Sequence, residues 1–440
     1  MGIAAGSLLA LAFRVFSMFL WAAVGVLTAR TLSVEERGVY ASVIVVTSAI
    51  VGIGSFSSAT GFFVSNRHRP PAEVATNGAM LGIGLGALLL AGGAASWLFV
   101  GGAFGHLAAL GAIAMFPALI RGSWLGVLLG SNRLAAYNAG ANLQVFLGFF
   151  LLAGWVGVLG HRSAEAALAA WAVAQYLGLL PFLSWARPWV RWARAHGGTP
   201  ELMRGLIRFS LVTGAGGAVA LITNRVDLLL VVALDSEAAA GIYSVAISVT
   251  EALLLFSAAI AVATYARVGG VGREEAGHLT ATGIRHTMMV VVAGAAGAAL
   301  FAPVAVELLF GARYSEAATP LRIMCLGAVM SAPGPLLHNY FTVQLGRPAI
   351  GVWLASGACL VNVTAAVLLI PPFGTTGAAC ATVLTSGVGT AAAVLLFLRL
   401  SGVPGSELWR VRRADIVSYL DLARSVLRGR VFRPAPATLR

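Results

Sequence analysis

Twelve runs of mainly apolar residues, separated by short polar segments, follow one another along almost the whole chain. Each run has 19 to 26 residues, and a helix of about 20 residues rises about 30 Å, the thickness of the hydrocarbon core of a bilayer. Only 10% of the residues are charged and 59% are hydrophobic, which is too apolar for a soluble globular protein. We therefore predict an all-α polytopic membrane protein. The predicted spans are residues 7–29, 39–64, 77–100, 108–129, 138–159, 167–185, 209–233, 242–265, 287–306, 321–344, 350–370 and 378–398.

A turn that follows the first span returns after the seventh. LSVEERGVYASV (residues 32–43) is matched by LDSEAAAGIYSV (residues 234–245), with one residue added, and the tyrosines of the two turns stand 203 residues apart. Six spans per half is an even number, so both halves cross the membrane in the same direction. We predict a lobe at 1–185, a cytoplasmic amphipathic connector at 186–208, a second lobe at 209–398 and a cytoplasmic basic tail at 399–440.

The arginines indicate the orientation. With the N-terminus in the cytoplasm, 21 arginines fall in cytoplasmic segments and 4 in outer loops; without the tail the numbers are 12 and 4. Positive charge collects on the cytoplasmic side, so both termini are expected there. The net charge of +13 is explained by this topology better than by nucleic-acid binding.

In the connector, tryptophans and arginines alternate at helical spacing. Trp185, Trp189 and Trp192 are spaced i, i+4 and i+7, and three arginines follow the same spacing on the other side of the helix. This pattern predicts an interfacial helix with tryptophan at the level of the head groups. The alternative is an ordinary cytoplasmic linker.

Five motifs in order carry a family resemblance. They are ARTLSVEERGVY (29–40), RVDLLLVVALDSEAAAGIYSVA (225–246), LLFGARYSEAATPLRIM (308–324), QLGRP (344–348) and IPPFGTTGAACAT (370–382). Together they resemble the polysaccharide, or lipid-linked oligosaccharide, flippases of the multidrug/oligosaccharidyl-lipid/polysaccharide exporter (MOP) superfamily. The resemblance implies two parallel six-helix lobes related by a pseudo-twofold along the membrane normal, and a central cavity lined largely by spans 1, 2, 7 and 8. It also implies no enzymatic activity and no cofactor.

Two arginines lie within the first six spans, and no acidic residue does. Arg14 is eight residues into span 1 and Arg121 fourteen into span 4. The positive field of this half would suit an anionic ligand such as a lipid diphosphate, because guanidinium groups pair well with its oxygens. The alternatives are that Arg14 extends to the cytoplasmic face and that Arg121 binds backbone carbonyls.

The second half carries both signs of charge at one depth. Arg225 in span 7 and Glu251 in span 8 lie eight and nine residues from the outer face, so they can form an interhelical ion pair. Arg225 is also a candidate for the anionic head group. Asp227 points about 200° away from Arg225 on a helix. Asp227 or Glu251 is then left without a cation, which makes the two carboxylates candidates for coupling to a proton or sodium ion.

Other polar residues in the spans are interpreted as joining helices, although they could bind sugar hydroxyls. They are Tyr40, Tyr243, Asn339, Tyr340, Gln344 and Asn362. Gly214, Gly216 and Gly217 mark either a bending point of span 7 or a close helix contact. The three cysteines lie in apolar runs without metal-ligand spacing, and no metal site is predicted.

The resemblance implies a flippase that moves an undecaprenyl-diphosphate-linked oligosaccharide across a bacterial cytoplasmic membrane by rocking two lobes, and the positive first half of the sequence agrees with this anionic cargo. Its partners would be membrane lipid, the lipid-linked glycan, a proton or sodium ion, and glycan polymerase or glycosyltransferases. The first alternative is a cation-coupled multidrug exporter of the same fold. A membrane-embedded glycosyltransferase or polysaccharide ligase is disfavoured, because the predicted outer loops have only about 5 to 17 residues, too few for the extramembrane substrate loop of such enzymes.

Overall fold

In the computed structural model, every regular element of the described residues is a helix. The described residues are 16–410, with gaps at 18, 21–22, 25–26, 29–30, 33, 55, 161–162 and 311. The first half contains α2 (Val34–Gly54), α3 (Ser57–Ser65), α4 (Pro71–Ala95), α5 (Gly102–Gly130), α6 (Leu134–Leu152), α7 (Ala164–Leu177) and α8 (Leu180–His196). The second half contains α9 (Pro200–Leu234), α10 (Glu237–Gly270), α11 (Arg273–Leu300), α12 (Ala302–Phe310), α13 (Ala318–Ser331), α14 (Gly334–Asn339), α15 (Pro348–Ser401) and α16 (Ser406–Trp409). Short π-helical turns extend α4 (Ser96–Val100), α6 (Ala153–Val158) and α14 (Tyr340–Gln344), and a 3₁₀ turn (Ala312–Ala317) precedes α13.

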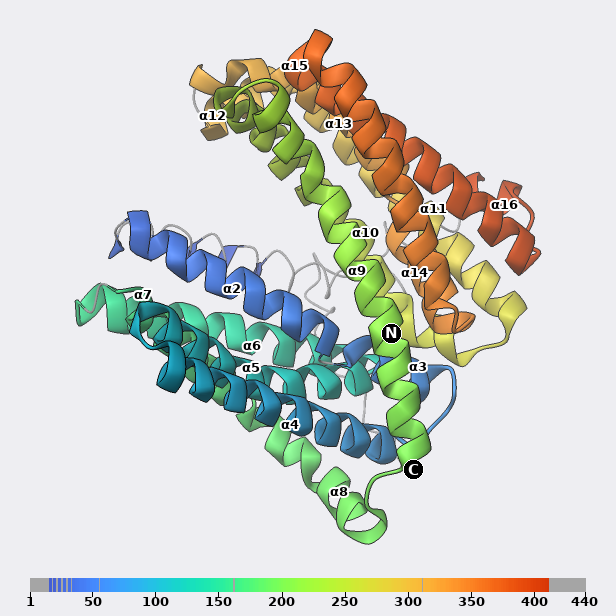
Figure 1. Cartoon of the computed structure of the whole chain (residues 1–440). Helices are drawn as coiled ribbons and strands as arrows, with labels where there is room; N and C mark the ends of the chain where they lie inside the picture. Colours follow the sequence, from blue (N-terminus) through green and yellow to red (C-terminus); the bar gives the residue numbers. More distant parts are fainter. Residues whose placement is uncertain are drawn as a thin grey trace, which may run out of the picture.

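Nine stretches of the described residues are long and apolar enough to cross a membrane. They cover ten of the predicted spans, because Pro348–Ser401 holds the eleventh and the twelfth. Within α15 the chain reverses at Gly374, whose φ of 54° and ψ of −134° are not helical, and Figure 1 shows both arms of this hairpin. Predicted span 7 lies in α9. Predicted span 1 lies mostly outside the described residues.

The helices form two lobes that meet at one end and separate at the other (Figure 1). Helices α2 to α8 form the first lobe, and α10 to α16 form the second. Each lobe has its own apolar core, with Phe182 and Leu168 fully buried in the first and Phe397 and Leu321 in the second. The predicted all-α, two-lobed fold is confirmed.

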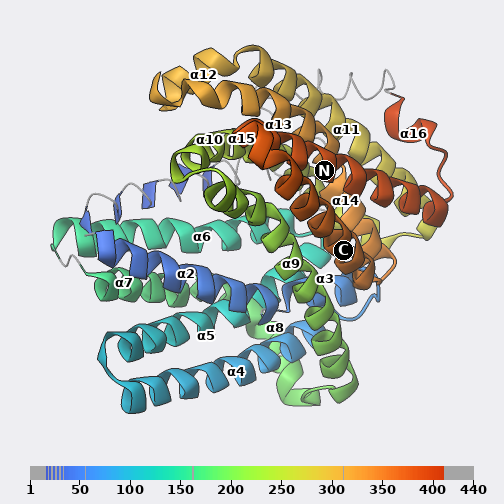
Figure 2. The ribbon, with the colours of Figure 1, turned by 45° about the horizontal axis from the view of Figure 1, so that its top comes forward.

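Helix α9 bridges the lobes at their seam, as Figures 1 and 2 both show. Near its start, Leu206 and Phe209 belong to the core of the first lobe, whereas Val231 near its end belongs to the core of the second. Residues 200–208, predicted as part of the connector, are therefore the first turns of this 35-residue helix.

The predicted amphipathic helix of the connector is α8, but one of its tryptophans faces the protein. Trp189 is buried and packs on Trp124 of α5 with ring centroids 5.4 Å apart, and its carbonyl accepts a hydrogen bond from Thr76 of α4. Trp189 therefore contacts protein rather than lipid, and the level of α8 at the membrane interface stays a prediction. The indole lies in the aromatic cluster of the first lobe instead, where burial removes more apolar surface from water.

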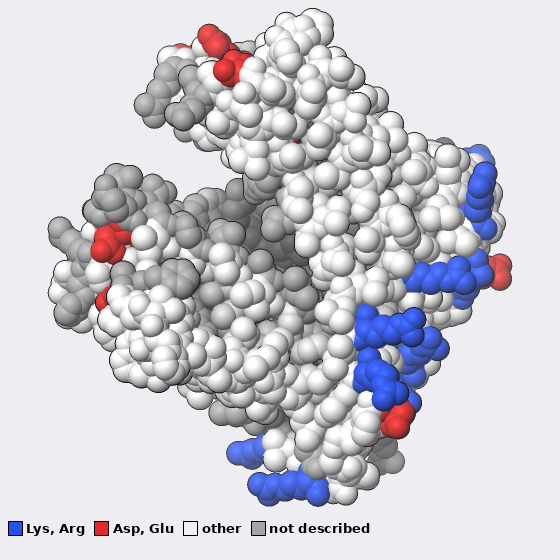
Figure 3. All heavy atoms as spheres, viewed as in Figure 1, with Lys and Arg blue, Asp and Glu red and all other residues white. Residues whose placement is uncertain are grey.

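Charge divides the molecule into two ends. Most of the described arginines gather where the lobes meet, and acidic groups stand at the tips of both lobes on the other side (Figure 3). We call these the basic end and the acidic end. Figure 3 also shows a deep hollow between the lobes that opens at the acidic end.

Candidate functional site

Two neighbouring cavities lie between the lobes, above the place where they meet. One has a volume of about 560 Å³ and is walled by the glycines of α9, including Gly214 and Gly217. The other, of about 360 Å³, is lined by Tyr265 and Asn339. Ser58 of the first lobe and His338 of the second line both cavities. The floor of the cleft therefore consists of backbone exposed at glycines and of a few neutral or weakly basic polar side chains.

Below this floor the basic end is closed by direct contacts between the lobes. The Asn66 side chain donates a hydrogen bond to the carbonyl of Gln344 at 2.9 Å, and the Tyr265 hydroxyl donates to the carbonyl of Ser58 at 3.3 Å. Beside these contacts, Phe62 of the first lobe stacks on Phe209 of the bridging helix α9 with centroids 4.5 Å apart. These contacts seal the cleft at the arginine-rich end, so its contents are reached from the acidic end.

The glycines of the seam permit this close approach. A Cβ on Gly346 would lie 2.7 Å from the Phe62 ring, and one on Gly269 would lie 2.5 Å from the Ser65 hydroxyl. Gly346 also has a φ of +61°, which only glycine adopts without strain. Backbone of the second lobe therefore packs directly on side chains of α3.

In the second lobe, a buried carboxylate joins three helices. Asp227 of α9 is 5% exposed. Its Oδ2 accepts hydrogen bonds from the hydroxyls of Tyr243 (2.8 Å) and Thr382 (3.2 Å), and its Oδ1 accepts one from the backbone N–H of Leu228 (2.8 Å). A buried carboxylate needs such donors because burial removes its hydration. The network fixes α9, α10 and α15 relative to one another.

The same carboxylate lines a polar cavity of about 170 Å³ inside this lobe. Glu251, Thr385 and Asn362 line it as well. Asn362 is 2% exposed, and its side-chain oxygen has no hydrogen-bond partner among the described residues. The cavity thus brings together the two predicted ion-coupling residues, Asp227 and Glu251, with an amide oxygen that is free to accept a cation or a donor.

In the first lobe, a buried guanidinium takes the central position. Arg121 of α5 is 8% exposed, and it donates to the side-chain oxygens of Gln175 (3.0 Å) and Gln144 (3.5 Å). Its Nε has no partner among the described atoms. In this conformation Arg121 faces amide oxygens rather than the backbone carbonyls of the alternative interpretation. Its role in anion binding stays a prediction.

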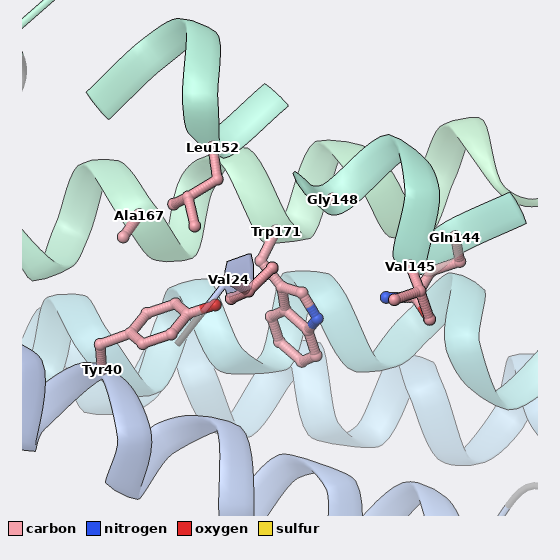
Figure 4. A pocket seen from close by; sticks show the side chains of 8 residues that line it. All are labelled: Val24, Tyr40, Gln144, Val145, Gly148, Leu152, Ala167 and Trp171. Atoms are coloured by element: carbon pink, nitrogen blue, oxygen red, sulfur yellow. The ribbon is translucent and has the colours of Figure 1, made fainter. Parts of the chain in front are cut away.

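The tyrosine of the first repeated turn lines the same small pocket as Gln144, at its opposite end, among apolar side chains. Tyr40 is buried, and its hydroxyl points toward Val24 and Trp171 (Figure 4). The free space between these side chains is about 10 Å³, enough for about one water molecule. Among the described residues, this position of the first lobe therefore contains neither a carboxylate nor a cavity like that of the second.

The other predicted anion-binding residues lie outside what the structure describes. Arg14 precedes the described residues, and of Arg225 only the helical backbone in α9 is described. The interpretation that polar residues join helices fits Asn339, which donates to the carbonyl of Ala261, and Gln344, which donates to that of Val271. Gly214, Gly216 and Gly217 lie in an unbroken part of α9.

Sequence reasoning missed His338. It lies in predicted span 10, and it contacts the cleft from α14, where Gly351 faces its ring. An ionisable residue at membrane depth is by default a candidate for function, so the signal was present in the sequence. The candidate site residues were chosen among arginines and carboxylates, and His338 is neither.

Comparisons with known proteins agree with this architecture. A family model described as "Polysaccharide biosynthesis protein" matches residues 149–319. No curated protein matches the chain. A multidrug resistance MATE family transporter of the MOP superfamily, solved in an outward-facing conformation, aligns with a TM-score of 0.76 and 18% identity over 91% of this chain and 95% of its own.

Two further solved structures give the same result. A MATE transporter in complex with MaL6 aligns with a TM-score of 0.79 and 17% identity over 91% of this chain and 96% of its own. A MOP superfamily transporter from Pyrococcus furiosus aligns with a TM-score of 0.75 and 17% identity over 91% of this chain and 95% of its own. The reverse polarity of its binding pocket suggests a different function for that transporter. The resemblance indicated by the sequence motifs is confirmed: the chain has the two-lobed fold of the MOP-superfamily exporters, and its middle part matches a polysaccharide biosynthesis family.

Proposed function

We propose that the chain is a flippase that moves an undecaprenyl-diphosphate-linked oligosaccharide from the cytoplasmic to the outer leaflet of a bacterial cytoplasmic membrane. The match to a polysaccharide biosynthesis family supports a glycan cargo. The single observation that carries the mechanism is the cleft, which is closed at the basic end and open at the acidic end. Since arginine-rich ends face the cytoplasm, this is the conformation in which an outward transporter releases its cargo.

The anionic diphosphate would be held by arginines of the cleft. Arg14 and Arg225 remain the proposed contacts, with Arg121 as a third. A guanidinium binds phosphate oxygens through two parallel hydrogen bonds, which gives the interaction both strength and orientation. The glycan itself would meet the glycines and hydroxyl groups of the cleft, including Ser58 and Thr213.

The coupling cation would bind in the second lobe. Asp227 supplies a negative charge there, and the free oxygen of Asn362 and the hydroxyl of Thr385 line the same cavity. Oxygen ligands suit sodium, and a carboxylate also accepts a proton. Binding of a cation at a junction of α9, α10 and α15 would change how these helices pack, and hence the position of α9 at the seam.

The test is reconstitution of the full chain in proteoliposomes with a fluorescent polyprenyl-diphosphate-linked oligosaccharide. Transfer between leaflets is measured as glycan that becomes accessible to an added lectin. We expect the wild-type protein to transfer the glycan lipid. In Arg14→Gln and in Arg225→Gln the rate of transfer should fall at least about tenfold, because each variant removes one charge-assisted contact. Arg399→Gln, on the surface of the basic end, is the matched control and should be unchanged. Equal transfer by all variants would remove the proposed anion site.

A cation-coupled multidrug exporter is the second candidate. The two carboxylates near the cavity of the second lobe and the fold shared with a MATE family transporter favour it. It predicts that the same proteoliposomes accumulate a cationic dye when a sodium or proton gradient is imposed. Dye transport without glycan-lipid transfer would replace the flippase proposal with this one.

A further inference from the structure

A groove of about 640 Å³ lies at the basic end, outside the cleft. It is formed by the end of α3, the start of α9 and the start of α15. Arg67, Arg69 and Arg208 line it, together with the apolar side chains of Phe63 and Phe209. The groove thus has basic side chains and an apolar surface side by side. The proposed transport of glycan uses none of the three arginines.

All three arginines stand at the boundary of the membrane. Arg67 and Arg69 come two and four residues after Ser65, the last residue of an apolar stretch that can span the bilayer. Arg208 directly precedes Phe209, where a predicted span begins. Because apolar spans end at the level of the lipid head groups, the three guanidinium groups lie at the depth of lipid phosphates.

The turn after α3 holds its arginines in place. The backbone N–H of Arg67 donates to the carbonyl of Phe62 (3.4 Å), and that of Arg69 donates to the carbonyl of Phe63 (3.0 Å). Two prolines, Pro70 and Pro71, follow at once and begin α4. This turn is therefore restricted before any ligand binds, which lowers the entropy lost on binding.

Positive charge in the groove exceeds negative charge. Arg69 forms an ion pair with Glu73 at 3.6 Å, and the Arg67 guanidinium lies 5.6 Å from the centre of the Phe62 ring. No carboxylate of the described residues pairs with Arg67 or Arg208. Two guanidinium groups beside an apolar surface fit an anion that carries its own hydrocarbon.

We propose that this groove binds the phosphate head group of an anionic phospholipid of the leaflet at the basic end. Its volume is in the range of small-molecule sites, about 300 to 1,000 Å³. The groove draws on both lobes, because α3 belongs to the first and Gly346 and Pro348 to the second. A bound lipid therefore favours the conformation in which the seam at the basic end is closed, and opening of this end requires its release.

The test compares lipid binding by the purified full-length protein and two double variants, using native mass spectrometry with phosphatidylglycerol and phosphatidylcholine. Arg67→Gln with Arg208→Gln removes the unpaired guanidinium groups. Arg399→Gln with Arg410→Gln removes the same charge from exposed sites at the same end that do not line the groove. We expect phosphatidylglycerol to bind the first double variant about tenfold more weakly than the wild-type protein and the control to be unchanged.

Three outcomes would overturn the proposal. Equal weakening in the control variant would mean general attraction to a basic surface. Equal binding of phosphatidylcholine would mean that the head-group charge is not recognised. Competition by millimolar inorganic phosphate, or binding of a polyprenyl diphosphate in place of phosphatidylglycerol, would assign the groove to another phosphate compound. Glycan-lipid transfer in liposomes of neutral lipid tests the flippase proposal separately, since it does not depend on this groove.

Discussion

The two repeated turns place a tyrosine at the same point of each lobe, but the two tyrosines meet different surroundings. Tyr243 shares hydrogen bonds with Asp227 and Thr382 beside a cavity of about 170 Å³. Tyr40 faces Val24 and Trp171, with space for about one water molecule. Among the described residues, the tyrosine of the second lobe therefore stands beside a carboxylate and a cavity, and that of the first lobe does not.

The first lobe has a buried charge of the opposite sign. Arg121 takes the interior position there, held by Gln175 and Gln144. A guanidinium stays protonated and an amide does not titrate, so this network has one charge state. The carboxylate of the second lobe can exchange a cation or a proton. Under the proposed function, the charge of the second lobe would change with ion binding, whereas that of the Arg121 network would stay fixed.

The largest expected effect follows from Asp227→Asn. The amide keeps the size of the side chain and an oxygen that accepts from Tyr243, but it removes the charge that we propose holds a cation. We expect glycan-lipid transfer driven by an ion gradient to fall at least about tenfold. Asp235→Asn, in the exposed turn after α9, is the control. Undiminished gradient-driven transfer by Asp227→Asn would make the two lobes functionally alike.

A matched pair, Tyr243→Phe and Tyr40→Phe, compares the two tyrosines directly. The first leaves a buried carboxylate without one donor, which costs about 1.5–3 kcal/mol of stability for a hydrogen bond to a charged group. The second removes a hydroxyl from an apolar setting, which changes stability by less than about 0.5 kcal/mol. Thermal unfolding in detergent measures both. Equal losses would show that Tyr40 also has a polar partner in the folded protein.

The network of Arg121 should depend on its shorter hydrogen bond. Gln175→Leu removes the acceptor at 3.0 Å from a buried guanidinium, and Gln144→Leu removes the one at 3.5 Å. We expect unfolding free energies lower by about 1–2 kcal/mol and by less than about 1 kcal/mol, respectively. If both variants keep wild-type stability but lose glycan-lipid transfer, the guanidinium serves the cargo rather than the fold.

The smallest effect is expected at the seam. Asn66→Ala removes one hydrogen bond between the lobes, worth about 0.5–1.5 kcal/mol. A cysteine introduced by Ser65→Cys should then react with a water-soluble maleimide about threefold faster. Asn138→Ala, which removes a bond within α6 only, is the control and should leave the rate unchanged. No difference between the two variants would mean that the apolar contacts alone close this end.

Much of the fold could be predicted because a helix that crosses a membrane must pair its own backbone N–H and C=O groups and must be long and apolar enough to span the bilayer. Both requirements appear in the sequence as long apolar runs. Gly374 illustrates the remaining uncertainty. Spans 11 and 12 were predicted with a loop at 371–377, where the chain instead turns within a nearly continuous hairpin. Pro371 and Pro372 indicate a break, but hydropathy does not give the residue at which the chain reverses, which is Gly374.

The sequence indicated individual residues of the candidate site but not which of them lie together in the folded protein. The positions of Asp227 and Arg121 in apolar spans marked them as unusual. Their partners lie far away in sequence, since Thr382 is 155 residues from Asp227 and Gln175 is 54 from Arg121. Hydropathy gives the depth of a residue but not the direction of its side chain. Which groups meet is decided by how the helices pack.

Helix α9 has a consequence for hybrids made from related transporters. Its first turns are anchored under Phe62 and Trp189, and its last turns lie in the core of the other lobe. Recombining halves at residue 209, the boundary suggested by hydropathy, would therefore pair the start of one parent's helix with the end of another's. A junction in the short loop at 197–199 keeps the helix intact. The second half must then come from a parent whose first turns of α9 carry side chains that pack against Phe62 and Trp189 of the first half.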